Sequence, residues 1–248
     1  MNIKIHIPNM LTLINLFCGC LLVYYTLYYS LTDQKFPEEF INIALILLGV
    51  SLVADLLDGM VARWLNVASP IGLQLDSLAD MVTFGVFPGF LMAKMFNQLK
   101  DTSTNDFPAI AFFGLLITLF SALRLAKFNV DTTQISYFKG LATPANTIFI
   151  FGVYMLLPEL SLAFLQNYGI NLLISITVIS SLLLVADIPL FSFKMKSFKF
   201  KDILPQLILL ISSIILLIFM GLKALSIIVI VYIILSIIFK KSFVHAST

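Results

Sequence analysis

Long apolar runs dominate the chain, and short segments richer in polar and charged residues separate them. A helix needs about 20 mostly apolar residues to cross the hydrocarbon region of a membrane. Measured against that length, the sequence predicts about eight membrane-spanning helices. Their expected ranges are 9–30, 40–64, 73–96, 108–128, 143–158, 168–188, 203–222 and 224–240. We therefore expect an all-α fold, a polytopic bundle of transmembrane helices.

The last two of these helices contain no acidic residue between positions 203 and 240, which indicates a structural hairpin. We expect residues 1–190 to form a catalytic membrane domain of six helices. Residues 191–248 are expected to form a basic loop followed by the C-terminal hairpin. Lysines that alternate with Phe and Ser indicate that the loop contacts lipid headgroups: Lys194, Lys196, Lys199 and Lys201.

Composition supports a membrane protein. Of the 248 residues, 60% are hydrophobic and only 11% are charged, and the mean hydropathy is +1.04. Soluble domains contain about 25% charged residues, so this chain departs strongly from them. The net charge of +2 gives no support for nucleic-acid binding.

The basic residues predict the orientation in the membrane, because cytoplasmic loops carry an excess of Lys and Arg. If successive helices cross the membrane in opposite directions, the loops alternate between its two sides. The side of the N-terminus then holds eleven basic residues: Lys4, Arg63, Arg124, Lys127, Lys139, Lys194, Lys196, Lys199, Lys201, Lys240 and Lys241. The other side holds four: Lys35, Lys94, Lys100 and Lys223. We therefore expect both termini to be cytoplasmic.

Four aspartates carry the candidate chemistry. Asp55 and Asp58 fall in the last turns of the second expected helix, and Asp76 and Asp80 fall in the first turns of the third. Spacings of three and four place each pair on one helix face. The short connection between the helices should make them antiparallel neighbours, with all four carboxylates converging just inside the cytoplasmic surface.

Four ionised carboxylates so close together would repel one another and would be costly to dehydrate, so protonation or bound cations must compensate. Oxygen ligands in this number suit Mg²⁺ or Mn²⁺. Two such ions can hold a phosphoryl group and stabilise both the attacking and the leaving oxygens. The small residues Gly59, Ala62 and Gly72 leave room for a ligand near the aspartates, and Arg63 can pair with a phosphate.

Other readings fit less well. Asp76 or Asp80 alone could serve the positive end of a helix dipole, but Asp55 and Asp58 lie toward a negative end. A cation transporter also carries intramembrane aspartates, usually near the bilayer midplane on broken, repeated helices. The two histidines, His6 and His245, lie near the termini, which argues against a histidine-based triad or zinc site.

The run from Asp55 to Asp80 resembles the signature of the CDP-alcohol phosphotransferase family. It reads Asp-x-x-Asp-Gly-x-x-Ala-Arg, eight residues, then Gly-x-x-x-Asp-x-x-x-Asp. Pro8, Asn9 and Thr12 match the family's Pro-Asn-x-x-Thr opening, although a helix-start role would also explain them. The resemblance implies metal binding by Asp55, Asp58, Asp76 and Asp80, with Asp80 as the general base. It implies a nucleotide site made of Asn9, Thr12, Asp58, Gly59, Ala62, Arg63 and Gly72.

Two further stretches, 124–129 and 140–145, are similar to segments of the family's bacterial phosphatidylserine synthase branch. Lys127 stands where an arginine is usual, and Ala142 where a proline is usual. The resemblance implies transfer of the phosphatidyl group from CDP-diacylglycerol to L-serine, in a homodimer of a bacterial inner membrane. Glycerol 3-phosphate, inositol phosphate and choline stay open as acceptors. Arg124, Lys127 and Lys139 could bind the acceptor or could contact lipid headgroups.

Overall fold

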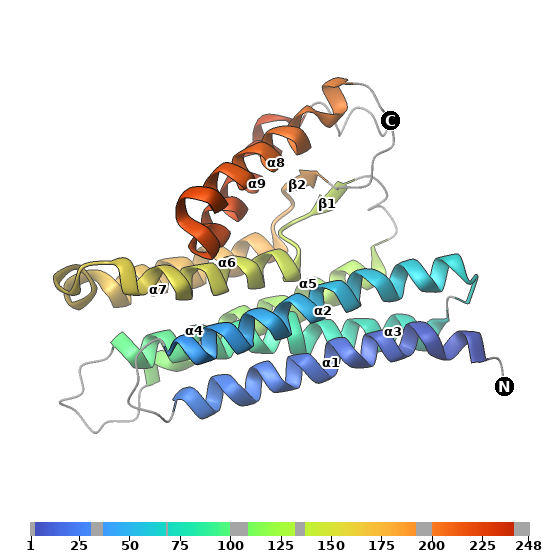
Figure 1. Ribbon diagram of the computed structural model, residues 1–248, viewed down its shortest axis with the longest axis horizontal. Helices are drawn as coiled ribbons and strands as arrows, with labels where there is room; N and C mark the ends of the chain where they lie inside the picture. Colours follow the sequence, from blue (N-terminus) through green and yellow to red (C-terminus); the bar gives the residue numbers. More distant parts are fainter. Residues whose placement is uncertain are drawn as a thin grey trace.

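The computed structural model describes residues 3–30, 37–67, 69–99, 109–131, 137–191 and 200–240. The expected headgroup-binding lysines Lys194, Lys196 and Lys199 lie outside these residues. Long helices run roughly side by side through most of the molecule, and a C-terminal helical hairpin is inclined to them (Figure 1).

The first half of the chain forms α1 (Ile3–Ser30), α2 (Glu38–Trp64) and a continuous helical run from Pro70 to Leu99. This run comprises α3 (Pro70–Asp80), the π-helix η1 (Met81–Val86) and α4 (Phe87–Leu99). The short helix η2 (Ala109–Leu115) then leads into α5 (Leu116–Val130).

The second half begins with the strand β1 (Tyr137–Lys139) and the helix α6 (Thr143–Leu156), which continues into η3 (Leu157–Glu159). Next come α7 (Leu162–Val185) and the strand β2 (Pro189–Phe191). The hairpin consists of α8 (Phe200–Met220), η4 (Gly221–Ala224) and α9 (Leu225–Ile238).

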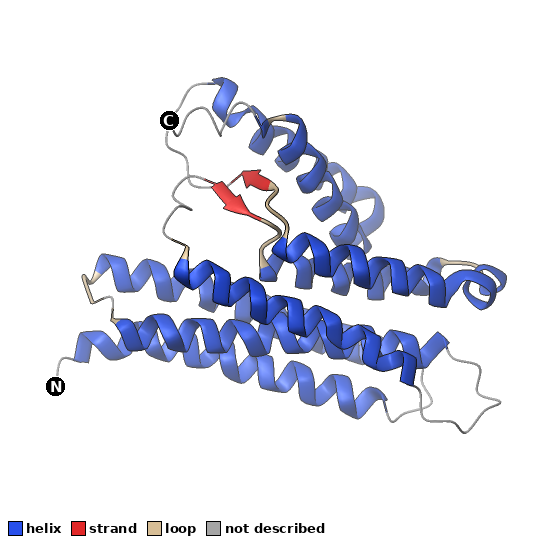
Figure 2. Cartoon of the chain, turned by 180° about the vertical axis from the view of Figure 1, so that it is seen from behind, coloured by secondary structure: helices blue, strands red, loops and turns tan. Residues whose placement is uncertain are grey.

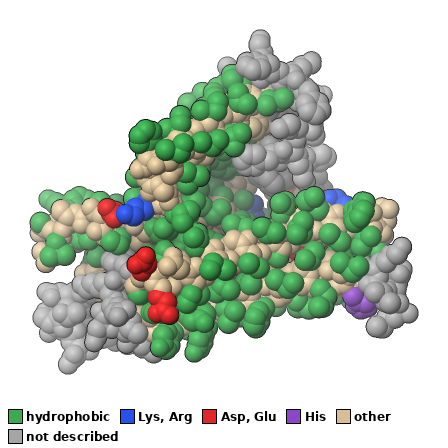
Figure 3. All heavy atoms as spheres, viewed as in Figure 1, with side chains coloured by type: hydrophobic (Ala, Val, Ile, Leu, Met, Phe, Trp, Pro, Cys, Tyr) green, Lys and Arg blue, Asp and Glu red, His purple; other side chains and the backbone are tan. Residues whose placement is uncertain are grey.

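Six helical stretches are long and apolar enough to cross a membrane: His6–Ser30, Glu38–Trp64, Pro70–Leu99, Ala109–Val130, Leu162–Val185 and Ile203–Ile238. Large apolar side chains such as Phe17 and Ile46 are exposed on these helices, and hydrophobic side chains cover much of the face seen in Figure 3. Such a surface suits lipid rather than water. The chain is therefore built as an integral membrane protein, and the expected helix bundle is confirmed.

The expected number of eight spans is not confirmed. The fifth expected span corresponds to α6, which has only 14 residues. The last two fall within the single stretch Ile203–Ile238, where Gly221 has a φ of 60° between α8 and α9. The count of eight therefore stays a prediction.

The core lies between α1, α2, α4 and α6. Phe84 of η1 and Phe87 and Leu91 of α4 are fully buried there. Gly19 lets α1 approach η1 closely, since a Cβ at this position would lie 3.0 Å from the Thr83 Cα. This approach brings α1 against the segment that directly follows Asp80.

A two-stranded antiparallel ribbon, β1–β2, was not predicted from the sequence. Its register pairs Lys139 with Pro189, and it lies between the helix bundle and the C-terminal hairpin (Figure 2). Three-residue strands carry too little periodicity to be distinguished from loops. The ribbon borders the second of the two pockets described below.

Candidate active site

Local sequence signals fix the ends of the two helices that carry the aspartates. Ser69 caps α3, and its hydroxyl accepts a hydrogen bond of 3.0 Å from the Gly72 N–H. Pro70 occupies the first turn, where its missing N–H costs nothing. Asn66 follows α2 with a φ of 54°, the left-handed conformation that commonly ends helices. The chain can therefore turn between α2 and α3 within a few residues.

The helices α2 and α3 were expected to be antiparallel neighbours, but they make few contacts with each other. Both pack instead against α1. Their carboxylates consequently face each other across a space rather than across a packed interface. Like charges on the facing helices oppose direct packing, and a cation between them would remove that obstacle.

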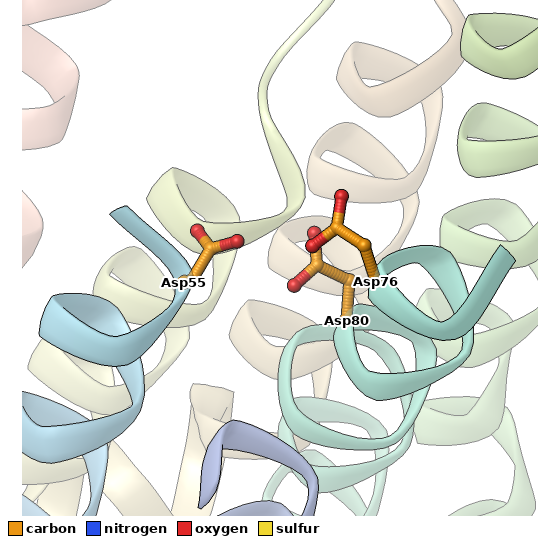
Figure 4. A group of neighbouring side chains, drawn as sticks. All are labelled: Asp55, Asp76 and Asp80. Carbon is orange, nitrogen blue, oxygen red and sulfur yellow. The ribbon is translucent and has the colours of Figure 1, made fainter. Parts of the chain in front are cut away.

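Three of the four aspartates converge: Asp55, Asp76 and Asp80. One carboxylate oxygen from each lies within 4.8 Å of the others, and the side chains point toward one another from α2 and α3 (Figure 4). The Asp76 Oδ1 is buried and has no hydrogen-bond partner among the described residues. Three converging oxygen ligands and a buried, unsatisfied oxygen suit a hard divalent cation. The cluster is thus able to hold a metal ion.

Asp58 lies beside this group without being one of its three members. Its Oδ2 accepts a hydrogen bond of 2.5 Å from the Thr12 hydroxyl, and its side chain is buried. The structure therefore does not show the expected convergence of all four aspartates. A donor from α1 engages the fourth carboxylate beside the cluster.

Asn15 of α1 forms a hydrogen bond with Asp80. The Asn15 side-chain amide donates to the Asp80 Oδ1 at 3.2 Å, and the Asn15 backbone carbonyl accepts from the Thr83 hydroxyl at 3.0 Å. Asn15 is completely buried. The only sequence signal for this role was a polar amide in an otherwise apolar span, one turn after Thr12.

A pocket of about 220 Å³ opens beside Asp58 and Asp76 at the ends of α1, α2 and α3. All seven residues expected to bind the nucleotide line it: Asn9, Thr12, Asp58, Gly59, Ala62, Arg63 and Gly72. A side chain at Gly72 would crowd the Ser69 Oγ and the Asn9 Oδ1, at 3.2 and 3.3 Å from its Cβ. Glycine at position 72 therefore avoids a close contact with two other residues that line this pocket.

A second, smaller hollow of about 50 Å³ brings together the three residues expected at the acceptor site: Arg124, Lys127 and Lys139. The buried Arg124 donates from Nε to the Leu141 carbonyl at 2.7 Å and lies near enough to Asp80 for their charges to interact. Asp131, which pairs with Lys139 at 3.3 Å, and Asp187 also line this hollow. Of the residues that line the hollow, Arg124 is thus one whose charge acts on the carboxylate cluster.

Comparison with known proteins agrees with this arrangement. The sequence model of the CDP-alcohol phosphatidyltransferase family matches residues 5–191, about three quarters of the chain. This chain belongs to that family. The match includes the carboxylate cluster and both pockets, so the resemblance inferred from the signature is confirmed.

Individual relatives carry one enzyme name. The chain is 33% identical to the CDP-diacylglycerol–serine O-phosphatidyltransferase of Bacillus subtilis over 56% of its own length and 70% of the relative's. It is 30% identical to the enzyme of that name from Helicobacter pylori, over 82% and 79% of the two chains. The enzyme of that name from Saccharomyces cerevisiae is 31% identical over 60% and 54%.

Within this family member, sequence reasoning missed Asn15, Thr83 and Asp187. Asn15 and Thr83 act on the site through hydrogen bonds whose partners lie more than sixty positions away, and no local pattern reports such contacts. Asp187 lies in the connection after α7, where no functional signal was expected. Its place in the same hollow as Arg124 depends on how α7 packs on the rest of the bundle.

Proposed function

We propose that this protein is a phosphatidylserine synthase, which transfers the phosphatidyl group from CDP-diacylglycerol to L-serine and releases CMP. The observation that carries the proposal is the convergence of Asp55, Asp76 and Asp80 beside a pocket that collects all seven nucleotide-site residues. The shared name of the three relatives supports serine as the acceptor.

In this proposal the cytidine diphosphate occupies the larger pocket. Asn9 and the backbone at Gly59 and Gly72 contact the nucleotide, and Arg63 pairs with a phosphate oxygen. Thr12 holds Asp58 in place at the wall of the pocket. The exposed apolar faces of the surrounding helices leave the diacylglycerol chains in the lipid.

Asp55, Asp76 and Asp80, with Asp58 beside them, would hold two Mg²⁺ or Mn²⁺ ions. Such ions neutralise the diphosphate and stabilise the charge that develops on the transferred phosphoryl group.

Asp80 takes the proton from the serine hydroxyl. The hydroxyl oxygen forms a bond to the phosphorus that carries the diacylglycerol, and the bond from that phosphorus to the CMP oxygen breaks. Asn15 fixes the orientation of the Asp80 carboxylate by its hydrogen bond to Oδ1. No histidine or cysteine lies among the residues that line the two pockets, which favours direct in-line displacement over a covalent intermediate.

Serine binds in the smaller hollow, where Arg124, Lys127 and Lys139 offer positive charge to its carboxylate. The excess of basic residues at the N-terminal side supports a cytoplasmic site, with both termini in the cytoplasm of a bacterial cell and the helices in its inner membrane. We also propose that residues 1–190 form the catalytic domain, that 191–248 add the hairpin, and that the enzyme works as a homodimer.

The first test is CMP release by purified protein with CDP-diacylglycerol, Mn²⁺ or Mg²⁺, and one acceptor at a time: L-serine, glycerol 3-phosphate, inositol 1-phosphate, choline or none. We expect release that requires serine and stops on addition of a chelator. Asp80→Asn should lower kcat by about 10²- to 10⁴-fold, the usual contribution of a general base. Glu38→Gln, which removes an exposed carboxylate at the first turn of α2, is the matched control and should leave the rate unchanged.

CMP release with another acceptor would support the proposed active site but show that serine is not the acceptor. The absence of release with every acceptor, from folded protein, would contradict the proposal, and cation transport through the aspartate cluster would then be measured.

A further inference from the structure

The smaller hollow contains charges of both signs. Its lining includes Arg124 and Lys127 of α5, Asp131 at the end of α5, Lys139 of β1, and Asp187 between α7 and β2. A site for a purely anionic acceptor would need only the cations. The two carboxylates therefore require an explanation.

One of the carboxylates already has a partner, since Asp131 pairs with Lys139 at 3.3 Å. Asp187 is different: its side chain is exposed to the hollow, and no ion pair or hydrogen bond of its carboxylate occurs among the described residues. It offers a negative charge that the protein itself does not neutralise. Arg124 lies across the same hollow, anchored by its Nε on the Leu141 carbonyl.

The backbone holds the Asp187 segment from two sides. Gly140, with a φ of 75°, donates its N–H to the Ile188 carbonyl at 2.9 Å, and the Leu141 N–H donates to the Leu183 carbonyl at 2.8 Å. A side chain at Gly140 would collide with the carbonyls of Leu184 and Ala186, so this position requires glycine.

The C-terminal hairpin holds the other side of the segment. The Tyr232 hydroxyl donates to the Phe191 carbonyl at 3.0 Å, and the two rings pack edge to face at 4.9 Å. Asp187 thus sits in a segment that is fixed at both ends, as a binding residue requires.

We propose that Asp187 binds the ammonium group of a small amino-alcohol acceptor and so determines the acceptor specificity of this enzyme. The inference rests on the proposed function and deepens it. Arg124 and Lys127 pair with the acceptor's carboxylate, and Asp187 pairs with its ammonium group. Each charge of a zwitterionic acceptor thus has a partner of opposite charge. We place the acceptor's hydroxyl toward Asp80, whose charge acts on Arg124.

The same arrangement disfavours the competing acceptors. A phosphorylated alcohol would bring two negative charges toward the Asp187 carboxylate, and like charges held together in a partly dehydrated hollow repel. The small volume of the hollow, about 50 Å³, also favours a small acceptor over inositol phosphate.

The test compares Asp187→Asn with Asp187→Glu and with Glu38→Gln, the matched control far from the hollow. Initial rates of CMP release are measured with L-serine, with 3-hydroxypropanoate, which lacks the amino group, and with ethanolamine, which lacks the carboxylate. Melting temperatures of all variants are measured in the same detergent.

We expect Asp187→Asn to raise the KM for serine by about 10- to 100-fold, as the loss of one charge-assisted contact predicts. The KM for CDP-diacylglycerol should change less than about twofold, because that substrate occupies the other pocket. The preference for serine over 3-hydroxypropanoate should fall by a similar factor, and Asp187→Glu should restore part of it. The control should match the wild type throughout.

A KM for serine that stays within twofold of the wild-type value in Asp187→Asn would overturn this inference and leave the proposed function intact. Equal losses with serine and 3-hydroxypropanoate, or a raised KM for CDP-diacylglycerol, would show a merely structural role and also overturn it. Wild-type protein that uses a phosphorylated acceptor and not serine would overturn both proposals together.

Discussion

At the scale of single residues, α1 supplies the groups that hold two of the four aspartates. Thr12 donates to Asp58 and Asn15 donates to Asp80. Helix periodicity correctly predicted that Asp76 and Asp80 would face Asp55, because spacings of three and four fix which side chains share a face. It could not predict that Asp58 would be engaged by Thr12, since that depends on how far α1 is shifted along α2.

The Thr12 contact leads to a specific prediction. Thr12→Val removes the donor and leaves a buried carboxylate oxygen without it, which costs about 1–3 kcal/mol at such positions. Because Asp58 lines the nucleotide pocket, we expect kcat/KM for CDP-diacylglycerol to fall by about 5- to 100-fold, while the KM for serine stays near the wild-type value. Initial-rate measurements with each substrate varied in turn check this.

Thr26→Val is the matched control for that experiment. Thr26 is also buried in α1, but its hydroxyl donates to the Leu22 carbonyl of its own helix, at 2.7 Å. Equal effects of the two substitutions would contradict the role assigned to Thr12.

At the scale of elements, the π-helix η1 directly follows Asp80 within the run from Pro70 to Leu99. Side chains from two neighbouring helices reach its backbone carbonyls. The Thr118 hydroxyl of α5 donates to the Gly85 carbonyl at 3.0 Å, and the Thr147 hydroxyl of α6 shares its proton between the Phe84 carbonyl at 3.1 Å and the Thr143 carbonyl of its own helix at 2.9 Å. In lipid, a carbonyl without such a donor would be costly. The sequence predicted one uninterrupted helix here, because a π-helix of only six residues leaves the long apolar run unbroken.

We predict that Thr147→Val destabilises the protein and also impairs the active site. The loss of the bond to Phe84 should cost about 1 kcal/mol and lower the melting temperature in detergent. Because η1 begins one residue after Asp80, kcat should fall severalfold with little change in either KM. Melting curves and initial rates on the same preparations measure both effects.

Thr177→Val separates stability from activity in this experiment. Thr177 is equally buried, but its hydroxyl donates to the Leu173 carbonyl within α7, at 2.7 Å. We expect its kcat to match the wild type, and a similar loss of kcat in both variants would argue against a role for η1 in placing Asp80.

At the scale of the whole molecule, the sequence predicted the bundle and its approximate helix ranges, because a helix that crosses a membrane needs a long run of apolar residues. It did not predict that the C-terminal hairpin would contact the site region. Tyr232 and Ser236 of α9 form hydrogen bonds to the Phe191 backbone, and Gly152 lets α6 approach α9 closely at Ser226. Contacts between elements so distant in sequence leave no periodic trace in either one.

The hairpin should therefore influence acceptor binding. Tyr232→Phe removes the hydroxyl that holds β2 and that lies near Arg124. We expect the KM for serine to rise about 3- to 10-fold, the effect of one neutral hydrogen bond, with the KM for CDP-diacylglycerol unchanged. Tyr168→Phe, at an exposed position of α7, is the control and should leave both constants unchanged; a rise in both KM values for Tyr232→Phe would refute this coupling.

The two pockets share no lining residue. On the proposed assignment, each substrate can enter or leave while the other stays in place, so neither one seals the other in. A nucleotide lipid that meets no amino acid can diffuse back into the bilayer unchanged. The two substrates would then bind in either order, and the rate of the reaction would respond to the concentration of each.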